Sequence, residues 1–417
     1  MSKQKLSKKD ATSAFPVVYP LSAGIDVGAG QHYVSVPAHL TDTPTRVFST
    51  HTKGLTELAD WLVSLGITTV AMESTGIYWL TVYDILVERN IEVCLANARY
   101  VRNVPGRKTD VKDSQWLQQL HSVGLLHRSF IPNEQIRVLR TYLRLRHQQV
   151  IAKGQAINRI EKSLQQMNIK LRQVISKIDT QVGMGIVRAI AAGEYHPTQL
   201  AEEHYNYRMK SSKEELARAL EGNYRAEYLF TLKQALRSWD FAHSELVLCE
   251  EEIERILQNW EKDSEELEDI SSKSFVSKQK KKKVRQNEYR FDVRSYLKEI
   301  LGVDMTKVEG LSENTVLDIV GEVGTDLSKW KTAKHFCSWL GLAPSPQISG
   351  GKVLKQFRKK MQSRATQAFR TAASTLHSSK THLGKIYRKL AITKGSQVAV
   401  KTVARKLATL FYTLITQ

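Results

Sequence analysis

Two aspartates stand three residues apart in the stretch "RKTDVKDSQWLQQL", which begins at Arg107. An apolar pattern with helical spacing follows Asp110 and Asp113, so both carboxylates are expected on one face of the first helical turn, with Thr109 at the N-cap position. Such a pair is more often simple compensation of the helix dipole. A chemical role would require further acids close by in the fold.

Two further acids end predicted strands. Asp26 closes the apolar run "SAGIDVG", and Glu73 closes "TTVAMESTG". An acid at a strand end is usually a turn residue, but neighbouring strands with acids at the same end bring two carboxylates together. Asp26, Glu73, Asp110 and Asp113 would then converge on one or two Mg²⁺ ions, an arrangement that serves phosphodiester displacement.

The C-terminal part of the chain has the opposite charge. From Leu327 to Gln417 there are eighteen Lys or Arg and no Asp or Glu, so this segment cannot hold a hard cation by itself. It contains "QISGGK", in which Ser349 precedes Gly350 and Gly351. Basic residues follow the glycines, namely Lys352, Lys355, Arg358 and Lys359. A glycine-rich basic loop most often binds phosphate or is a flexible connection, and a serine nucleophile would need help from elsewhere to lose its proton.

The elements that must position these residues change character along the chain. After a basic tail (1–19), short β-type runs alternate with helical ones over 20–134, which predicts an α/β sheet domain. Long helices are predicted over 135–304, with heptad seams from Ile157 to Ile178 and from Leu232 to Trp260 that would pair as an antiparallel hairpin or mediate self-association. A third, helical domain is expected over 305–417.

Composition indicates a polyanionic partner. The 417 residues include 62 Lys or Arg and 42 Asp or Glu, a formal net charge of +20. One basic tract near 273–286 is either a solvated linker or a phosphate contact, through Lys280, Lys281, Lys282 and Lys283. Because no apolar run of membrane length and no signal-peptide pattern is present, we expect a cytoplasmic, nucleoid-associated protein of a prokaryote with no membrane partner. Three distant cysteines predict buried thiols.

The order of these motifs resembles a known family. "GIDVG", "MESTGIYW" and "RKTDVKDS" are similar to the DEDD domain of Piv-like insertion-sequence transposases, called the "IS one-ten" family, whose N-terminal domain has a RuvC or ribonuclease-H-like fold. The segment from Val308 through "FCSWLGLAP" to "QISGGK" resembles the family's C-terminal transposase domain, including a helix-hairpin-helix-like start and a basic helix after the glycines.

The resemblance implies a function and a set of roles. Asp26, Glu73, Asp110 and Asp113 would be catalytic Mg²⁺ ligands, and Ser349 would be a nucleophile that forms a phosphoserine DNA intermediate during transposition. A guide (bridge) RNA and a homo-oligomer are further implied partners beside donor and target DNA. Two other readings stay open at this point: a metal-only structure-specific nuclease without a covalent intermediate, and an inactive nucleic-acid-binding protein.

Overall fold

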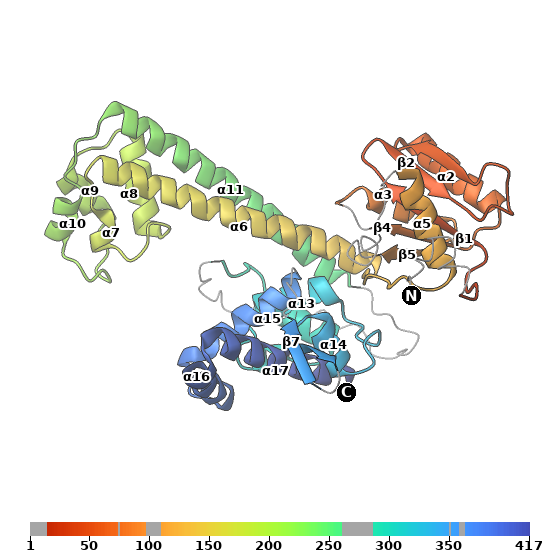
Figure 1. Ribbon diagram of the computed structural model, residues 1–417. Helices are drawn as coiled ribbons and strands as arrows, with labels where there is room; N and C mark the ends of the chain where they lie inside the picture. The colour runs from red at the N-terminus through yellow and green to blue at the C-terminus, as the bar shows by residue number, and fades with distance from the viewer. Residues whose placement is uncertain (1–14, 74–75, 97–109, 261–286, 350–351, 358–362) are drawn as a thin grey trace, which may run out of the picture. The chain divides into compact units, whose positions relative to one another are not determined.

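The chain forms two compact units, residues 1–131 and 132–417. The computed structural model describes residues 15–73, 76–96, 110–260, 287–349, 352–357 and 363–417, and for 345–349 and 352–357 it describes the backbone (Figure 1). The tail before residue 15, the tract Lys280 to Lys283, and Arg358 and Lys359 therefore lie outside the described residues. The predicted division of the second unit at residue 304 stays a prediction.

The first unit contains a mixed five-stranded sheet, as the alternating pattern predicts. Its strands follow the spatial order β3-β2-β1-β4-β5. They are β1 (Ser22–Val27), β2 (Gln31–Ser35), β3 (Thr45–Ser49), β4 (Thr69–Glu73) and β5 (Glu92–Ala96). The pairs β1–β2 and β2–β3 are antiparallel, whereas β4 is parallel to both β1 and β5.

Helices cover both faces of this sheet. Alternate residues of β1 (Ala23, Ile25 and Val27) are buried in one apolar core together with side chains of α2 (Thr52–Ser64) and α3 (Trp79–Glu88). Helix α5 (Asp110–Ser122) packs on the opposite face. Figure 1 shows α5 lying over the strands. An intervening glycine, Gly24, makes this close packing of α5 possible, because a Cβ there would lie 2.3 Å from Ser114 O and Gln118 N.

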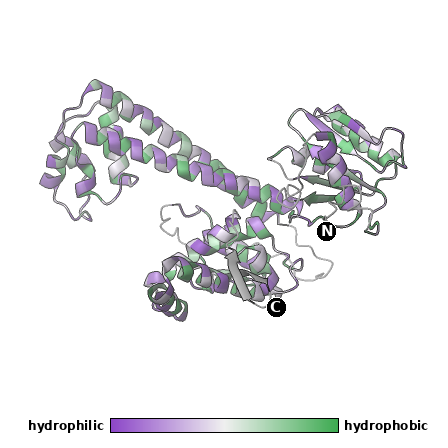
Figure 2. Cartoon of the chain, viewed as in Figure 1, coloured by the Kyte–Doolittle hydropathy of each residue, from purple (hydrophilic) through white to green (hydrophobic). Residues whose placement is uncertain are grey.

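Two long helices dominate the first part of the second unit. Helix α6 (Glu134–Gln166) and helix α11 (Ala226–Gln258) pack side by side (Figure 1). Arg146 contacts Glu250 near one end of the pair and Ser163 contacts Thr231 near the other, so the helices are antiparallel. The alternative of an intramolecular hairpin is therefore observed. Polar and apolar residues alternate along both helices, as expected for amphipathic elements (Figure 2).

The first heptad seam is shorter than predicted. Helix α6 ends at Gln166, and Asn168 has a positive φ of 62°, so the chain turns before the short helix α7 (Leu171–Val174). Helices α8 (Gln181–Ala192), α9 (Pro197–His204) and α10 (Lys213–Ala219) complete a small cluster. Of the seam residues beyond Met167, Leu171 and Ile178 are buried and Val174 is half-buried, because they join the core of this cluster rather than a continuous helix.

The remainder of the second unit is helical with one exception. Its helices are α12 (Val293–Leu301), α13 (Glu313–Val323), α14 (Ala333–Trp339), α15 (Arg364–Thr375), α16 (His382–Lys394) and α17 (Ser396–Thr416), with short 3₁₀ turns at Met305–Lys307 and Leu376–Ser378. Phe336, Phe369 and Phe411 are fully buried where α14, α15 and α17 meet. Ser312 caps α13 by accepting a hydrogen bond from Thr315 N.

The exception corrects the expectation of an all-helical domain with a loop and a basic helix around Ser349. Strands β6 (Ser345–Ser349) and β7 (Lys352–Phe357) pair as an antiparallel hairpin. The physical reason is present in the sequence: Ile348 and Val353 are β-branched residues on either side of a two-residue Gly-Gly connection, a pattern that favours a tight hairpin.

Candidate active-site residues of the two units

Two of the four predicted acids lie side by side in the sheet. Ile25 of β1 is opposite Met72 of β4 in the parallel register, so the next pair places Asp26 beside Glu73. Both strands run in the same direction, and both acids stand at their carboxyl ends. Because side chains alternate between faces, Asp26 shares the face of Gly24 and Glu73 that of Ala71, which is the face covered by α5.

Helix α5 brings the other two acids to the same edge. Its last turn contacts the beginning of β4, where His121 Nε2 lies 2.9 Å from Thr69 Oγ1. Its middle is held to the sheet by a hydrogen bond of 2.8 Å between Ser114 Oγ and Ser35 Oγ. The helix therefore runs opposite to β1 and β4. Its first turn, with Asp110 exposed and Asp113 half-buried, lies toward the carboxyl ends of these strands.

His121 anchors the far end of α5 without adding charge there. It is 2% exposed, and its ring stacks on Tyr19 with a centroid distance of 5.1 Å. Burial, with a smaller contribution from Arg128, lowers the pKa of His121 to about 4. The imidazole is therefore neutral at physiological pH, and the positioning of α5 rests on packing and hydrogen bonds.

The four acids share an edge, but their side chains are not drawn together into a cage. In the part of the chain that the structure describes, no three His, Cys, Asp or Glu side chains come close enough to hold a metal ion. Carboxylate oxygens are nevertheless the donors that Mg²⁺ takes, and β1, β4 and α5 carry the four carboxylates toward the same edge of the sheet. The carboxylate donors and their location at the carboxyl-terminal edge of β1 and β4 fit a metal site. That their side chains converge on one ion stays a prediction.

Ser349 occupies a defined place in the hairpin of the second unit. It is the last residue of β6 and pairs with Lys352, the first residue of β7, so only residues 350 and 351 separate the two. Lys355 lies opposite Gln347. The helices before and after the hairpin are joined to each other, because Thr366 of α15 donates a hydrogen bond of 2.7 Å to Leu340 O at the end of α14.

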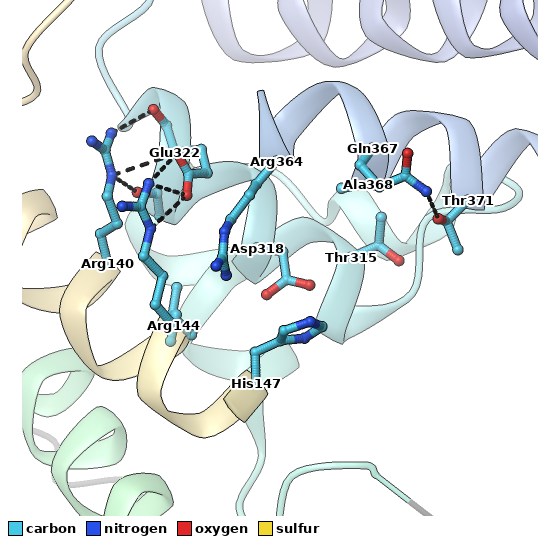
Figure 3. Close-up of a pocket in the computed structure, with 12 residues that line it drawn as sticks. Arg140, Arg144, His147, Thr315, Asp318, Glu322, Arg364, Gln367, Ala368 and Thr371 are labelled. Carbon is cyan, nitrogen blue, oxygen red and sulfur yellow. Dashed lines mark hydrogen bonds and ion pairs between the residues drawn. The ribbon is translucent and has the colours of Figure 1, made fainter. Parts of the chain in front are cut away.

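A pocket of about 300 Å³ lies beside α15, the helix that follows the hairpin. Arg140, Arg144 and His147 of α6 and Asp318 and Glu322 of α13 line it (Figure 3), together with Arg364, the first residue of α15. Arg144 makes an ion pair of 2.9 Å with Glu322. Burial raises the pKa of Asp318 to about 6, although Arg146 and Arg364 act in the opposite direction.

Sequence reasoning missed this pocket. It noted that acids are absent after Leu327 and did not consider Asp318 and Glu322 just before that point. The signal was available, since Arg140 and Arg144 on one helix and Asp318 and Glu322 on another each stand four residues apart. The sequence alone does not predict that α6 and α13, about 180 positions apart, pack together.

Two known protein families match the chain. Residues 23–169 match the family model of the IS110 DEDD domain, described as a transposase, and residues 305–388 match the model described as "Transposase IS116/IS110/IS902 family". The protein is thus an enzyme that acts on DNA in transposition. Because the two matches together cover more than half of the chain, it belongs to the IS110 family of transposases. No curated protein matched the chain.

Among the described residues, no helix is both long enough and apolar enough to cross a membrane.

Proposed function

We propose that this protein is the recombinase of an insertion sequence and that it cuts and exchanges DNA strands through a phosphoserine intermediate at Ser349. One observation supports the proposal most strongly. Asp26 and Glu73 stand at the carboxyl ends of adjacent strands, the first turn of α5 with Asp110 and Asp113 lies toward the same ends, and Ser349 ends a hairpin strand in a segment without acids. The strand order and the placement of α5 support a RuvC or ribonuclease-H-like type for the sheet domain.

The proposed step exchanges one phosphoester for another. The Ser349 hydroxyl oxygen forms a bond to the scissile phosphorus, and the bond between phosphorus and a deoxyribose oxygen breaks. The serine proton passes to a base and the leaving oxygen receives a proton. Since the energy of the ester is retained, the hydroxyl of another strand can displace Ser349 and rejoin the DNA without an external energy source.

Each charged group has a role in this step. Asp26, Glu73, Asp110 and Asp113 would hold Mg²⁺, which when bound supplies polarisation of phosphate oxygens and lowers the cost of alkoxide formation. Lys352, Lys355, Arg358 and Lys359 would neutralise the charge of the DNA backbone beside the serine. The basic tract Lys280 to Lys283 is a further proposed contact with nucleic acid.

The experiment that tests the serine chemistry is a denaturing gel. Purified protein that retains its co-purifying RNA is incubated with Mg²⁺ and labelled DNA carrying the ends of the element. A protein–DNA adduct is expected for wild type and for Ser345→Ala, a matched control at the other end of β6. It should be absent for Ser349→Ala and Asp110→Asn. If the DNA is cut without any adduct, and Ser349→Ala still cuts it, the result would instead favour the metal-only nuclease.

The proposed partners include a structured guide RNA, supported by the family membership and the net charge of +20. Digestion of the co-purifying RNA with ribonuclease before the gel assay should abolish the adduct, and re-addition of the extracted RNA should restore it. An adduct that forms equally well after digestion would contradict RNA guidance. The site of action we propose is the DNA of the cytoplasm.

A homo-oligomer is the second proposed assembly. Phe230, Phe241 and Leu248 of α11 are 62%, 65% and 54% exposed, and their spacing of eleven and seven residues places them on one side of the helix. Phe241→Ser is expected to lower the mass measured by light scattering to that of the monomer. Val63→Ser on α2, where Val63 is 49% exposed, should leave the mass unchanged.

An oligomer would allow the acids and the serine of one reaction to come from different subunits. Asp110→Asn chains mixed with Ser349→Ala chains should then recover adduct formation that neither variant has alone. If the mixture stays inactive while wild-type chains put through the same mixing remain active, the acids and the serine act within one chain.

A further inference from the structure

A large basic groove lies in the helical part of the second unit, in a region mostly outside the two family matches. Its volume is about 1250 Å³, and it is bordered by α6, α11, residues 172–182, the loop 206–211 and residues 287–290. Six basic side chains line it: Lys153, Arg172, Lys177, Arg208, Lys210 and Arg290. Only Lys153 belongs to the matched range 23–169.

The acids that line the groove do not balance this charge. They are Asp179, Glu250 and Glu288. Glu250 is committed elsewhere, because it forms a buried ion pair of 2.7 Å with Arg146. Arg172 is committed in the same way, because it forms an ion pair of 3.2 Å with Glu161 outside the groove. Five cations therefore face two acids, and the groove carries a positive potential that attracts polyanions.

Basic groups also crowd one another in the wall of the groove. The side chain of Arg290 donates a hydrogen bond of 3.1 Å to His243 Nε2. The Lys153 ammonium lies 5.2 Å from the centre of the Trp239 ring, which itself stacks on His243. Burial lowers the pKa of His243, and the nearby charges of Lys153 and Arg290 lower it further. A bound anion would relieve this repulsion.

An exposed aromatic ring stands in the loop 206–211, between the lining residues Asn206 and Arg208. Tyr207 is 78% exposed, and the guanidinium of Arg208 lies 5.4 Å from the centre of its ring. Tyr205 in the same loop is 37% exposed. Exposed aromatic rings beside basic residues are the surface on which unpaired bases stack, and duplex bases cannot use it because they are already stacked.

We propose that this groove binds the phosphodiester backbone of an unpaired nucleic-acid strand, with a base stacked on Tyr207. The basic residues neutralise successive phosphates, and the exposed aromatic ring selects single strands over duplex. Either a guide RNA or a displaced DNA strand would provide the phosphates and the unpaired base. Binding does not need the serine or the four acids, so the assay below stands apart from the cleavage chemistry.

The test is fluorescence anisotropy with full-length protein freed of nucleic acid. Labelled unstructured 20-nucleotide RNA, the same sequence in DNA, and the duplex are titrated at several salt concentrations. The variant Lys177→Gln/Arg208→Gln/Lys210→Gln is expected to bind both single strands at least about tenfold more weakly. The slope of log affinity against log salt should fall by about 2, since about 0.7 is lost for each phosphate contact.

The matched control removes three charges from exposed positions on α6 and α11, the two long helices that border the groove. Arg159→Gln/Lys162→Gln/Lys233→Gln lies outside the groove and should change affinity less than about twofold. Tyr207→Ala should weaken binding of single strands by about tenfold and leave duplex binding unchanged. Tighter binding of RNA or of DNA in the wild type identifies which strand the groove takes.

Three results would overturn the proposal. One is an equal loss in the groove and control variants, which would reduce the effect to net charge. Another is duplex binding that matches single-strand binding and responds equally to Tyr207→Ala. The third is displacement of the oligonucleotide by poly-glutamate of the same charge at the same concentration, which would make the groove a general site for acidic chains.

Discussion

The sheet domain and the C-terminal hairpin region carry opposite charge at the residues proposed for chemistry. The edge of the sheet has Asp26, Glu73, Asp110 and Asp113, whereas Leu327 to Gln417 contains no acid at all. A hard cation needs carboxylates, and a DNA phosphate is repelled by them. The difference shows why one stretch of chain cannot easily serve both tasks, and in the proposed mechanism the two tasks are divided between the two units.

The largest expected effect is the loss of adduct formation when one of the four acids or Ser349 is replaced. Asp110→Asn should reduce adduct formation by at least about a thousandfold, a loss typical of a catalytic group, and Ser349→Ala should form no adduct because it lacks the attacking oxygen. Only Asp110→Asn should weaken Mn²⁺ binding, measured by the electron paramagnetic resonance of the free ion. Loss of Mn²⁺ binding in Ser349→Ala would break the comparison, because the serine region would then hold metal.

A second prediction concerns an acid that the second unit uses for stability. Glu250 and Arg146 are 3% and 7% exposed, and Arg146 also lies over the Tyr289 ring at 3.7 Å. Glu250→Ala leaves a buried guanidinium unpaired and should cost about 3–5 kcal/mol in urea unfolding. Glu252→Ala removes an exposed pair with Arg255 and should cost less than about 1 kcal/mol. Similar costs for both would contradict the buried role.

A smaller effect is expected for the packing of α5 on the sheet. Gly24→Ala places a methyl group against the backbone of Ser114 and Gln118, and we expect a loss of stability of about 1–3 kcal/mol together with weaker Mn²⁺ binding. Gly30→Ala is the control, because nothing lies within 4 Å of an added Cβ there. Unchanged Mn²⁺ affinity in Gly24→Ala would separate the position of α5 from the metal site.

The smallest effect is a dependence of the sheet domain on pH. His121 has a pKa of about 4 in the folded protein and about 6.5 when unfolded, so below pH 6.5 the unfolded chain binds a proton that the folded chain does not. Stability should fall by about 2 kcal/mol from pH 7 to pH 5 on this account and level off below pH 4. Pulse proteolysis in urea, read on peptides of the first unit, measures the loss.

His121→Gln should show a shallower loss over the same range, whereas His39→Gln at an exposed position should follow wild type. An unchanged pH dependence in His121→Gln would show that other groups account for it.

Much of the fold was predictable because the patterns are local. Apolar runs that end in Asp26 and Glu73 predicted strands, and the mixed sheet confirms the α/β character of the first unit. The long helices α6 and α11 follow from their apolar spacing. The hairpin at Ser349 differs from the predicted loop and basic helix because a two-residue Gly-Gly connection between β-branched residues favours strand pairing, whereas the lysines that follow it carry no such local preference.

The sequence by itself determined the types of the groups proposed to react, the positions of the four acids near element ends and the absence of acids after residue 326. Only the tertiary structure decided that β1 and β4 are adjacent, that α5 runs opposite to them over Gly24, and that α6 packs on both α11 and α13. The physical reason is that hydrogen bonding and amphipathic periodicity act over a few residues. Strand order, helix direction and grooves arise instead from burial of surfaces contributed by distant parts of the chain.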